Sequence, residues 1–122
     1  MSSLLTDSEI LLKNTVGDFA RKEIAPRASI IDRTGEYPFE NVRQLAKMNL
    51  LGIPVAQQYG GAGAGVTGFA VSIRELAKAC ANTAFICGVH TMVALSLQLF
   101  GTDDQKARFL APLSRGERIG AF

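Results

Sequence analysis

Residues 79–102 contain no formally charged side chain, and this stretch limits the possible folds of the chain more than any other feature. A helix drawn over residues 84–100 is apolar on nearly all its faces, which is typical of a helix buried in a protein core. A membrane span is the alternative, because about 20 apolar residues cross a bilayer. No aromatic belt flanks the stretch, and the helix would measure only roughly 25 Å. Polar residues are also spread through it, which favours the core helix: Asn82, Thr83, His90, Thr91, Ser96 and Gln98.

Four more helices are predicted, and no strand. Apolar spacings of three and four, together with start and stop signals, place them at residues 7–32, 39–48, 67–81 and 102–112. Asn82 and Thr83 are interpreted as a break that caps the next helix, and Pro112 is expected to end the last one. We therefore expect an all-α fold with about five helices in an orthogonal or bundle-like array.

Capping and proline signals support two of these helices. Thr6 with Glu9, and Thr102 with Gln105, match the capping box, in which both side chains satisfy free backbone N–H groups at a helix start. Pro26 lacks an N–H group and is expected to kink or end the first helix.

Size and composition describe a single ordinary globular domain over residues 1–122, with 48% apolar and 20% charged residues. The formal charge of +2 comes from basic and acidic residues mixed along the chain, so neither nucleic-acid binding nor attraction to an anionic membrane is predicted. Residues 1–5 lack the basic and apolar regions of a secretory signal.

Few residues suggest chemistry by themselves. Cys80 and Cys87 lack a redox or zinc spacing, and one histidine cannot complete a metal site, so both cysteines are expected to be small buried residues and no metal is predicted. His90 inside the apolar helix is interpreted as a hydrogen-bonded core residue, with a catalytic base as the alternative. Three arginines either meet phosphates or, as we prefer, line a solvated face: Arg108, Arg115 and Arg118.

Gly63, Gly65 and Gly68 form a literal G-x-G-x-x-G. A dinucleotide site would need a strand before the motif and an acidic residue about twenty positions after it. Neither is evident, so we expect a tight turn whose glycines permit positive φ angles.

Several longer motifs occur in a consistent order. They read F-A-R-K-E-I-A-P-R-A and D-R-T-G-E-Y-P in residues 19–38, L-L-G-I-P-V and Y-G-G-A-G in residues 50–63, C-A-N-T in residues 80–83, and F-G-T-D-D-Q-K-A-R-F-L-A-P-L-S-R-G-E-R-I-G-A-F in residues 100–122. This series resembles the N-terminal helical domain of the acyl-CoA dehydrogenase family and covers nearly the whole chain. Two departures are minor: Met48-Asn49 stands where the family commonly has a glycine, and Pro54 is displaced by one or two positions.

The resemblance implies one domain of an FAD enzyme that oxidises the α–β bond of an acyl-CoA thioester and passes the electrons to an electron-transfer flavoprotein. In the family a glutamate removes the α-proton. That base and most flavin and CoA contacts belong to a β domain and a C-terminal helical domain, which begin with an A-L-T-E-P motif after the position of Phe122. No catalytic residue is therefore expected within residues 1–122, and the chain alone is expected to be inactive.

The resemblance also implies a role for particular residues. Ala84, Phe85, Gly88 and Met92 match the part of the family's helix that faces the acyl tail, and their spacing places them together on a helix face. Packing of that face within the core is the alternative. Phe122 matches the aromatic position at the start of the flavin contact.

Several wider expectations follow. An apolar helix without its neighbouring domains favours association, so a homo-oligomer or a dye-binding species is expected. A cytoplasmic or mitochondrial-matrix location fits the family and the absence of a visible signal. Two alternatives remain open: a stand-alone helical module that binds lipid or protein, and a domain of a related flavin oxidase or hydroxylase.

Overall fold

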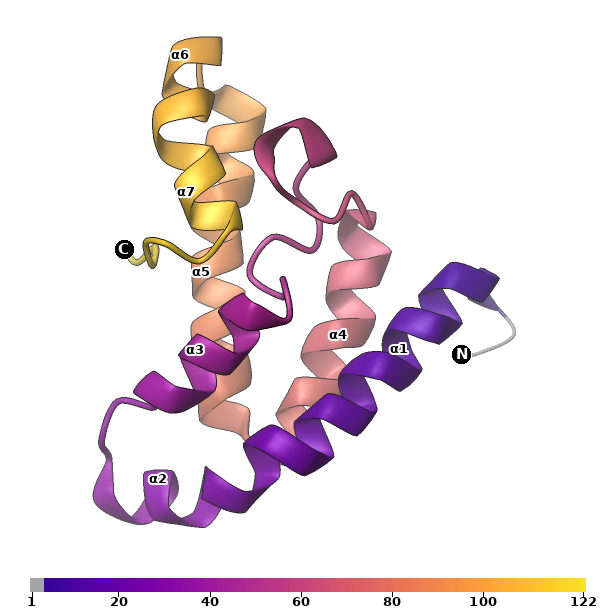
Figure 1. The fold of residues 1–122 in the computed structure, drawn as a ribbon, viewed down its shortest axis with the longest axis vertical. Helices are drawn as coiled ribbons and strands as arrows, with labels where there is room; N and C mark the ends of the chain where they lie inside the picture. The colour runs from indigo at the N-terminus through magenta and orange to yellow at the C-terminus, as the bar shows by residue number, and fades with distance from the viewer. Residues whose placement is uncertain (1–3) are drawn as a thin grey trace.

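A computed structural model describes residues 4–122 as an all-α domain, and no strand occurs among these residues. The predicted fold class is confirmed. Figure 1 shows α4 between α1 and α5, with the chain's last residues crossing α5 and ending to its left. The longest helix is α5. The α-helices are α1 (Asp7–Phe19), α2 (Ala28–Thr34), α3 (Phe39–Lys47), α4 (Gly65–Ala79), α5 (Ala81–Phe100), α6 (Asp103–Gln105) and α7 (Ala111–Ser114).

The expected irregularity at Pro26 is confirmed. The chain forms a π turn over Ala20–Ile24 and a 3-10 turn over Ala25–Arg27 before α2 resumes the helix. In a regular helix the Pro26 ring would clash with the carbonyl four residues earlier, and widening the preceding turn relieves that clash. Gly35, at φ 71°, then ends α2 in the left-handed conformation that glycine adopts at low cost.

Pro112 follows the same arrangement, and here the prediction is wrong. A π turn over Lys106–Leu110 precedes it, but the helix continues through Pro112 to Ser114. As at Pro26, the widened turn before Pro112 relieves the clash of its ring with the carbonyl four residues earlier.

Both capping boxes are confirmed. Thr6 Oγ1 accepts from the backbone N of Glu9 at 3.2 Å while Thr6 N donates to the Glu9 carboxylate at 2.9 Å, and Thr102 and Gln105 repeat these two bonds at the same distances. They close the starts of α1 and α6.

The break predicted at Asn82 and Thr83 is wrong. The break lies at Cys80, whose extended backbone (φ −159°, ψ 107°) separates α4 from α5. Both predicted residues fall in the first turn of α5, which begins three residues before the predicted start at Ala84. The start of α4 is likewise two residues earlier than the predicted residue 67.

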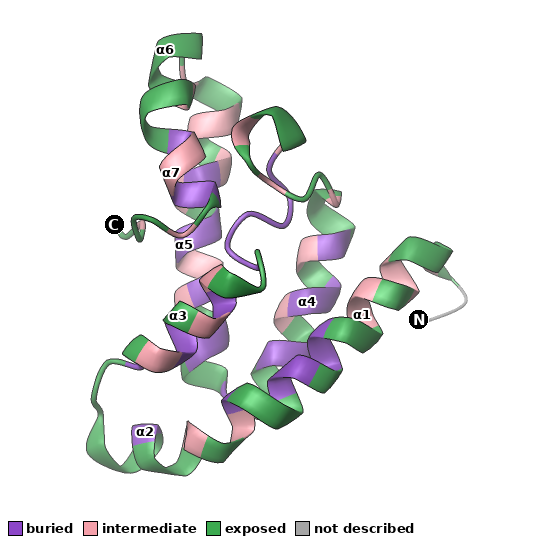
Figure 2. Ribbon diagram, in the orientation of Figure 1, coloured by how far each residue is buried: buried purple, intermediate pink, exposed green. Residues whose placement is uncertain are grey.

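A buried segment without regular secondary structure, residues 50–55, runs through the centre of the fold (Figure 2). Its side chains join α1, α4 and α5 in the main core, with Leu51 fully buried and Ile53 1% exposed. Val55 belongs to a smaller cluster with Ala94 and Leu110. The segment therefore connects the two parts of the core.

The glycine-rich stretch forms the expected turn. Gly63 has a φ of 65° and donates to the Val55 carbonyl at 2.8 Å. A Cβ atom on Gly61 would lie only 2.1 Å from the oxygen of Val55, so only glycine fits this close approach. No strand precedes Gly63 within residues 4–122, and the dinucleotide interpretation has no support.

Among residues 4–122, α5 alone is long and apolar enough to cross a membrane by length and composition. One face of α5, however, packs against the rest of the domain, and its buried polar side chains bond to other segments. These contacts place one face of α5 in the core, as predicted, while the other face exposes Phe85, Met92 and Leu99.

Candidate functional site

An apolar groove of about 330 Å³ lies between α4 and α5. Every residue that lines this apolar groove is uncharged and non-polar: Ile73, Ala77, Ala81, Ala84, Phe85, Gly88, Val89 and Met92. Such a surface removes water from an aliphatic chain and offers no side-chain hydrogen bond, so it selects by shape and hydrophobicity.

All four residues that the resemblance assigned to the acyl pocket line this apolar groove. Phe85 and Met92 lie two turns apart and are 72% and 51% exposed, whereas Ala84 is 4% exposed and lies deeper in the fold. A Cβ atom on Gly88 would meet nothing within 4 Å, so the wall has an open position between the two larger side chains. Their contact with an acyl tail remains a prediction.

The opposite face of α5 is built around His90, which is fully buried. Its Nε2 atom lies 3.1 Å from the Leu51 carbonyl and 3.0 Å from the Leu113 carbonyl, and its Nδ1 atom accepts from Gly120 N at 3.0 Å. Burial lowers the pKa of His90 against the weaker opposing effect of the two carbonyls. His90 is thus a hydrogen-bonded core residue, as its place in the apolar helix predicted, and both of its ring nitrogens have hydrogen-bond partners.

A second polar network on that face was not foreseen. The buried Asn41 side chain donates to Thr83 Oγ1 at 2.9 Å and accepts from Arg27 Nε at 2.7 Å, while Thr83 donates to Cys80 Sγ at 3.3 Å. The network joins α3, the start of α5 and the 3-10 turn at Pro26. No sequence signal links Asn41 to Thr83, because they lie 42 positions apart.

The two cysteines are free and buried, as predicted. Burial raises the pKa of the Cys87 thiol to about 12, so the group stays protonated near neutral pH and is a poor nucleophile. Its Sγ atom lies 3.6 Å from the Leu50 carbonyl. Within residues 4–122 no three His, Cys, Asp or Glu side chains gather in a way that could hold a metal ion.

The predicted cofactor residue, Phe122, lies at the end of an extended tail that follows α7. Its side chain is 87% exposed, so most of the ring is free to be covered by another molecule or domain. Gly120 packs against α5 so closely that a Cβ atom there would lie 2.8 Å from Val93 Cβ. The tail is thus packed against α5 at Gly120, whereas the side chain of Phe122 is exposed to solvent.

The arginines mostly pair with nearby acids. Arg108 contacts Asp104 at 3.3 Å, and Arg115 bonds through two nitrogens to Glu117 at 2.7 and 3.3 Å. The second pair raises the pKa of Arg115 and lowers that of Glu117. Arg118 is exposed. These positions match the solvated face that we expected.

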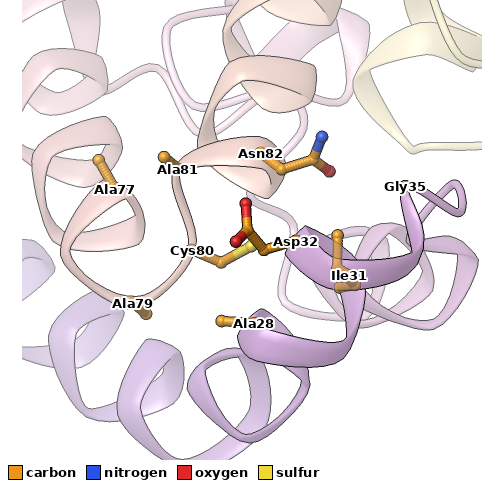
Figure 3. Close-up of a pocket in the computed structure, with 9 residues that line it drawn as sticks. All are labelled: Ala28, Ile31, Asp32, Gly35, Ala77, Ala79, Cys80, Ala81 and Asn82. Atoms are coloured by element: carbon orange, nitrogen blue, oxygen red, sulfur yellow. The ribbon is translucent and has the colours of Figure 1, made fainter.

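A further cavity of about 360 Å³ lies where α2 meets the junction of α4 and α5 (Figure 3). The Asp32 carboxylate points toward the centre of its lining residues. The remaining lining residues are mostly small and contribute few polar groups: Ala28, Ile31, Gly35, Ala77, Ala79, Cys80, Ala81 and Asn82. A single carboxylate among such residues assembles no catalytic set.

The chain matches known proteins along almost its whole length. Residues 6–117 match the family model described as "Acyl-CoA dehydrogenase, N-terminal domain". An acyl-CoA dehydrogenase of Bacillus subtilis and a short-chain specific acyl-CoA dehydrogenase of Clostridium acetobutylicum are each 40% identical over 119 residues, which is 97% of this chain. The structure of butyryl-CoA dehydrogenase from Megasphaera elsdenii superimposes with a TM-score of 0.87 at 30% identity over 94% of this chain. In all three comparisons the chain spans 31% of the relative's length.

Proposed function

Because the chain belongs to the acyl-CoA dehydrogenase family, whose N-terminal domain it matches, we propose that it forms part of an FAD-dependent enzyme that oxidises the α–β bond of acyl-CoA thioesters. The observation that carries the proposal is the apolar groove, which contains all four residues that the family motifs assign to the acyl pocket. We propose that these four residues form one wall of that pocket: Ala84, Phe85, Gly88 and Met92.

This domain would contribute by binding the acyl tail and by excluding water from it. Each methylene group moved from water into an apolar groove contributes about 0.8 kcal/mol. The exposed ring of Phe85 and the thioether of Met92 supply that surface, and Gly88 leaves room between them. Among the groove residues no side chain can take or give a proton, so the base that removes the α-proton has to come from another part of the protein.

FAD, when bound, would supply the hydride acceptor. Only the edge of its site would be provided by residues 1–122. Phe122 suits such a contact because its ring is exposed at the end of an anchored tail. We propose that the flavin and CoA contacts otherwise come from a β domain and a C-terminal helical domain.

The wider assignments follow from the family. We propose an acyl-CoA as substrate, an electron-transfer flavoprotein as the electron-accepting partner, and a homo-oligomer as the working assembly. The location would be the cytoplasm or the mitochondrial matrix. The exposed apolar side chains on α5 fit a surface that is covered in the assembled enzyme.

The test begins with the full open reading frame that encodes this chain. Its product should show a flavin absorption spectrum and should reduce an artificial electron acceptor when given an acyl-CoA. A protein that binds no flavin and turns over no acyl-CoA would contradict the proposal. A frame that lacks the A-L-T-E-P motif would favour the stand-alone binding module, and turnover of a substrate without CoA would favour an oxidase or hydroxylase.

Two variants test the groove within that enzyme. Phe85→Ser and Met92→Ser should each raise KM for an acyl-CoA several-fold, because they remove apolar contact with the tail. Leu11→Ser is the control, since Leu11 is 67% exposed on α1 and does not line the groove. Equal effects of all three substitutions would argue against a specific role for the groove.

A further inference from the structure

The hydrogen bonds of His90 define one protonation state. The Gly120 N–H group can only donate, so Nδ1 must accept and carries no proton. The carbonyls of Leu51 and Leu113 can only accept, so Nε2 carries the hydrogen and shares it between them. The arrangement is complete only for the neutral imidazole with its proton on Nε2.

These three partners come from different parts of the chain. Leu51 lies in the buried segment 50–55, Leu113 in α7 and Gly120 in the tail, at separations of 39, 23 and 30 positions from His90. Two of the three bonds join pieces of the core, whereas the third is the hydrogen bond that holds the tail to α5. Nε2 therefore connects parts of the core, whereas Nδ1 holds the tail.

We infer that His90 is a positioning residue that holds residues 120–122 against α5, and that the neutral imidazole holds this tail whereas the protonated imidazole releases it. Protonation places a second N–H group at Nδ1, where it faces the N–H group of Gly120 and removes its acceptor. The bonds from Nε2 to the two carbonyls survive that change. Release is thus confined to the tail, which under the proposed function is the segment that approaches the flavin.

Charged groups do not interfere with this titration. α5, α7 and segment 50–55 contain no Asp, Glu, Lys or Arg. The charged residues between α7 and residues 120–122, which are Arg115, Glu117 and Arg118, are all exposed. Burial lowers the pKa of His90, so release of the tail is expected below the ordinary histidine range near pH 6.5.

Nuclear magnetic resonance of the 122-residue chain tests the inference without any variant. At pH 7.5 the imidazole nitrogen shifts should show the neutral form with the proton on Nε2, and the Gly120 amide should exchange slowly with solvent. On acidification the Gly120 amide should lose its protection in step with imidazole protonation. A proton on Nδ1 at pH 7.5, or a Gly120 amide indifferent to imidazole protonation, would overturn the inference.

Two substitutions separate the ring nitrogens. His90→Gln can keep a donor near the Nε2 position but lacks the Nδ1 acceptor, so exchange of the Gly120 amide should rise by roughly tenfold, the loss expected for one hydrogen bond. His90→Asn can keep an acceptor near Nδ1, so Gly120 protection should be retained and should no longer depend on pH between 5 and 7. Equal loss of protection in both folded variants would indicate a merely structural histidine and would contradict the inference. None of these measurements involves flavin, so their failure is distinguishable from failure of the proposed function.

Discussion

The two faces of α5 are built from similarly apolar sequence but have different surroundings. The inner face is covered by the rest of the domain and includes Ala84, Cys87 and Ala94, together with the buried polar residues Thr83, His90 and Thr91. The outer face carries Phe85, Met92 and Leu99 at seven-residue intervals, with exposed fractions of 72%, 51% and 71%. Residues seven positions apart lie nearly above one another on a helix, so the three form a continuous stripe.

The inner face contains the buried polar side chains, and the outer face carries the large exposed apolar ones. A polar side chain is stable in the interior when each of its hydrogen-bonding atoms has a partner, as His90 and Thr83 show. Large apolar side chains such as Phe85 are exposed to solvent in this domain, so they mark a surface for another molecule or domain. Hydrophobicity alone therefore does not identify which face of this helix is its own core.

The largest difference should appear between a leucine of segment 50–55 that packs against the inner face, Leu51, and a leucine on the outer stripe, Leu99. Leu51→Ala should lower the free energy of unfolding by about 2–5 kcal/mol, because Leu51 is fully buried in the cluster that contains Ala84 and Cys87. Leu99→Ala on the outer stripe should change it by less than about 0.5 kcal/mol. Urea denaturation of both variants measures this contrast. Similar losses would mean that the outer face also belongs to the core.

Hydroxyl groups offer a second contrast. Thr83→Val should lower the free energy of unfolding by about 1–3 kcal/mol, because the buried Asn41 amide loses its acceptor. Ser96→Ala on the exposed side removes only a bond to the Met92 carbonyl and should be within about 0.5 kcal/mol of the wild type. If Thr83→Val proved as mild as Ser96→Ala, the polar network of the inner face would contribute nothing to stability.

Lowering the pH should reduce the free energy of unfolding through His90 on the inner face. Because the folded-state pKa of His90 is lowered, the unfolded chain takes up the proton first, so stability is complete above about pH 6.5 and falls as pH decreases. One such group contributes at most about 1.4 kcal/mol per pH unit. Urea denaturation at pH 7.5 and 5.5 should show a larger loss for wild type than for His90→Asn. Identical losses would exclude His90 as the source.

The smallest effect should be a gain. Gly88→Ala places a methyl group in open space beside the apolar groove and should stabilise α5 by up to about 1 kcal/mol. Gly120→Ala is the opposite case, since its methyl group would collide with Val93. Thermal unfolding compares the two. A loss of stability for Gly88→Ala would show that the groove is more tightly filled than the structure indicates.

Local sequence signals predicted the fold well where a single segment determines the structure. Thr6 and Thr102 marked two helix starts correctly, and Pro26 marked the irregular turn. The prediction failed at Asn82 and Thr83, because the polar pair resembled a cap, whereas Thr83 bonds to Asn41 of α3 from within the first turn of α5. The prediction also failed at Pro112, since a preceding π turn allowed the helix to continue past this residue.

The candidate site could be predicted only in part. Helical spacing placed Phe85, Gly88 and Met92 on one side of α5, and the resemblance supplied their expected role. Neither showed that Ile73 and Ala77 of α4 complete the apolar groove, because that depends on how two helices pack. The partners of His90 were also out of reach, since all three lie more than twenty positions away.

Photolabelling tests the proposed use of the outer face most directly. The product of the full open reading frame would be irradiated with an acyl-CoA whose acyl chain carries a diazirine, and the labelled residues would be mapped by mass spectrometry. We expect label within residues 85–92, and this label should be lost on competition with unmodified acyl-CoA. Competed label that falls elsewhere in the protein and spares these residues would contradict it.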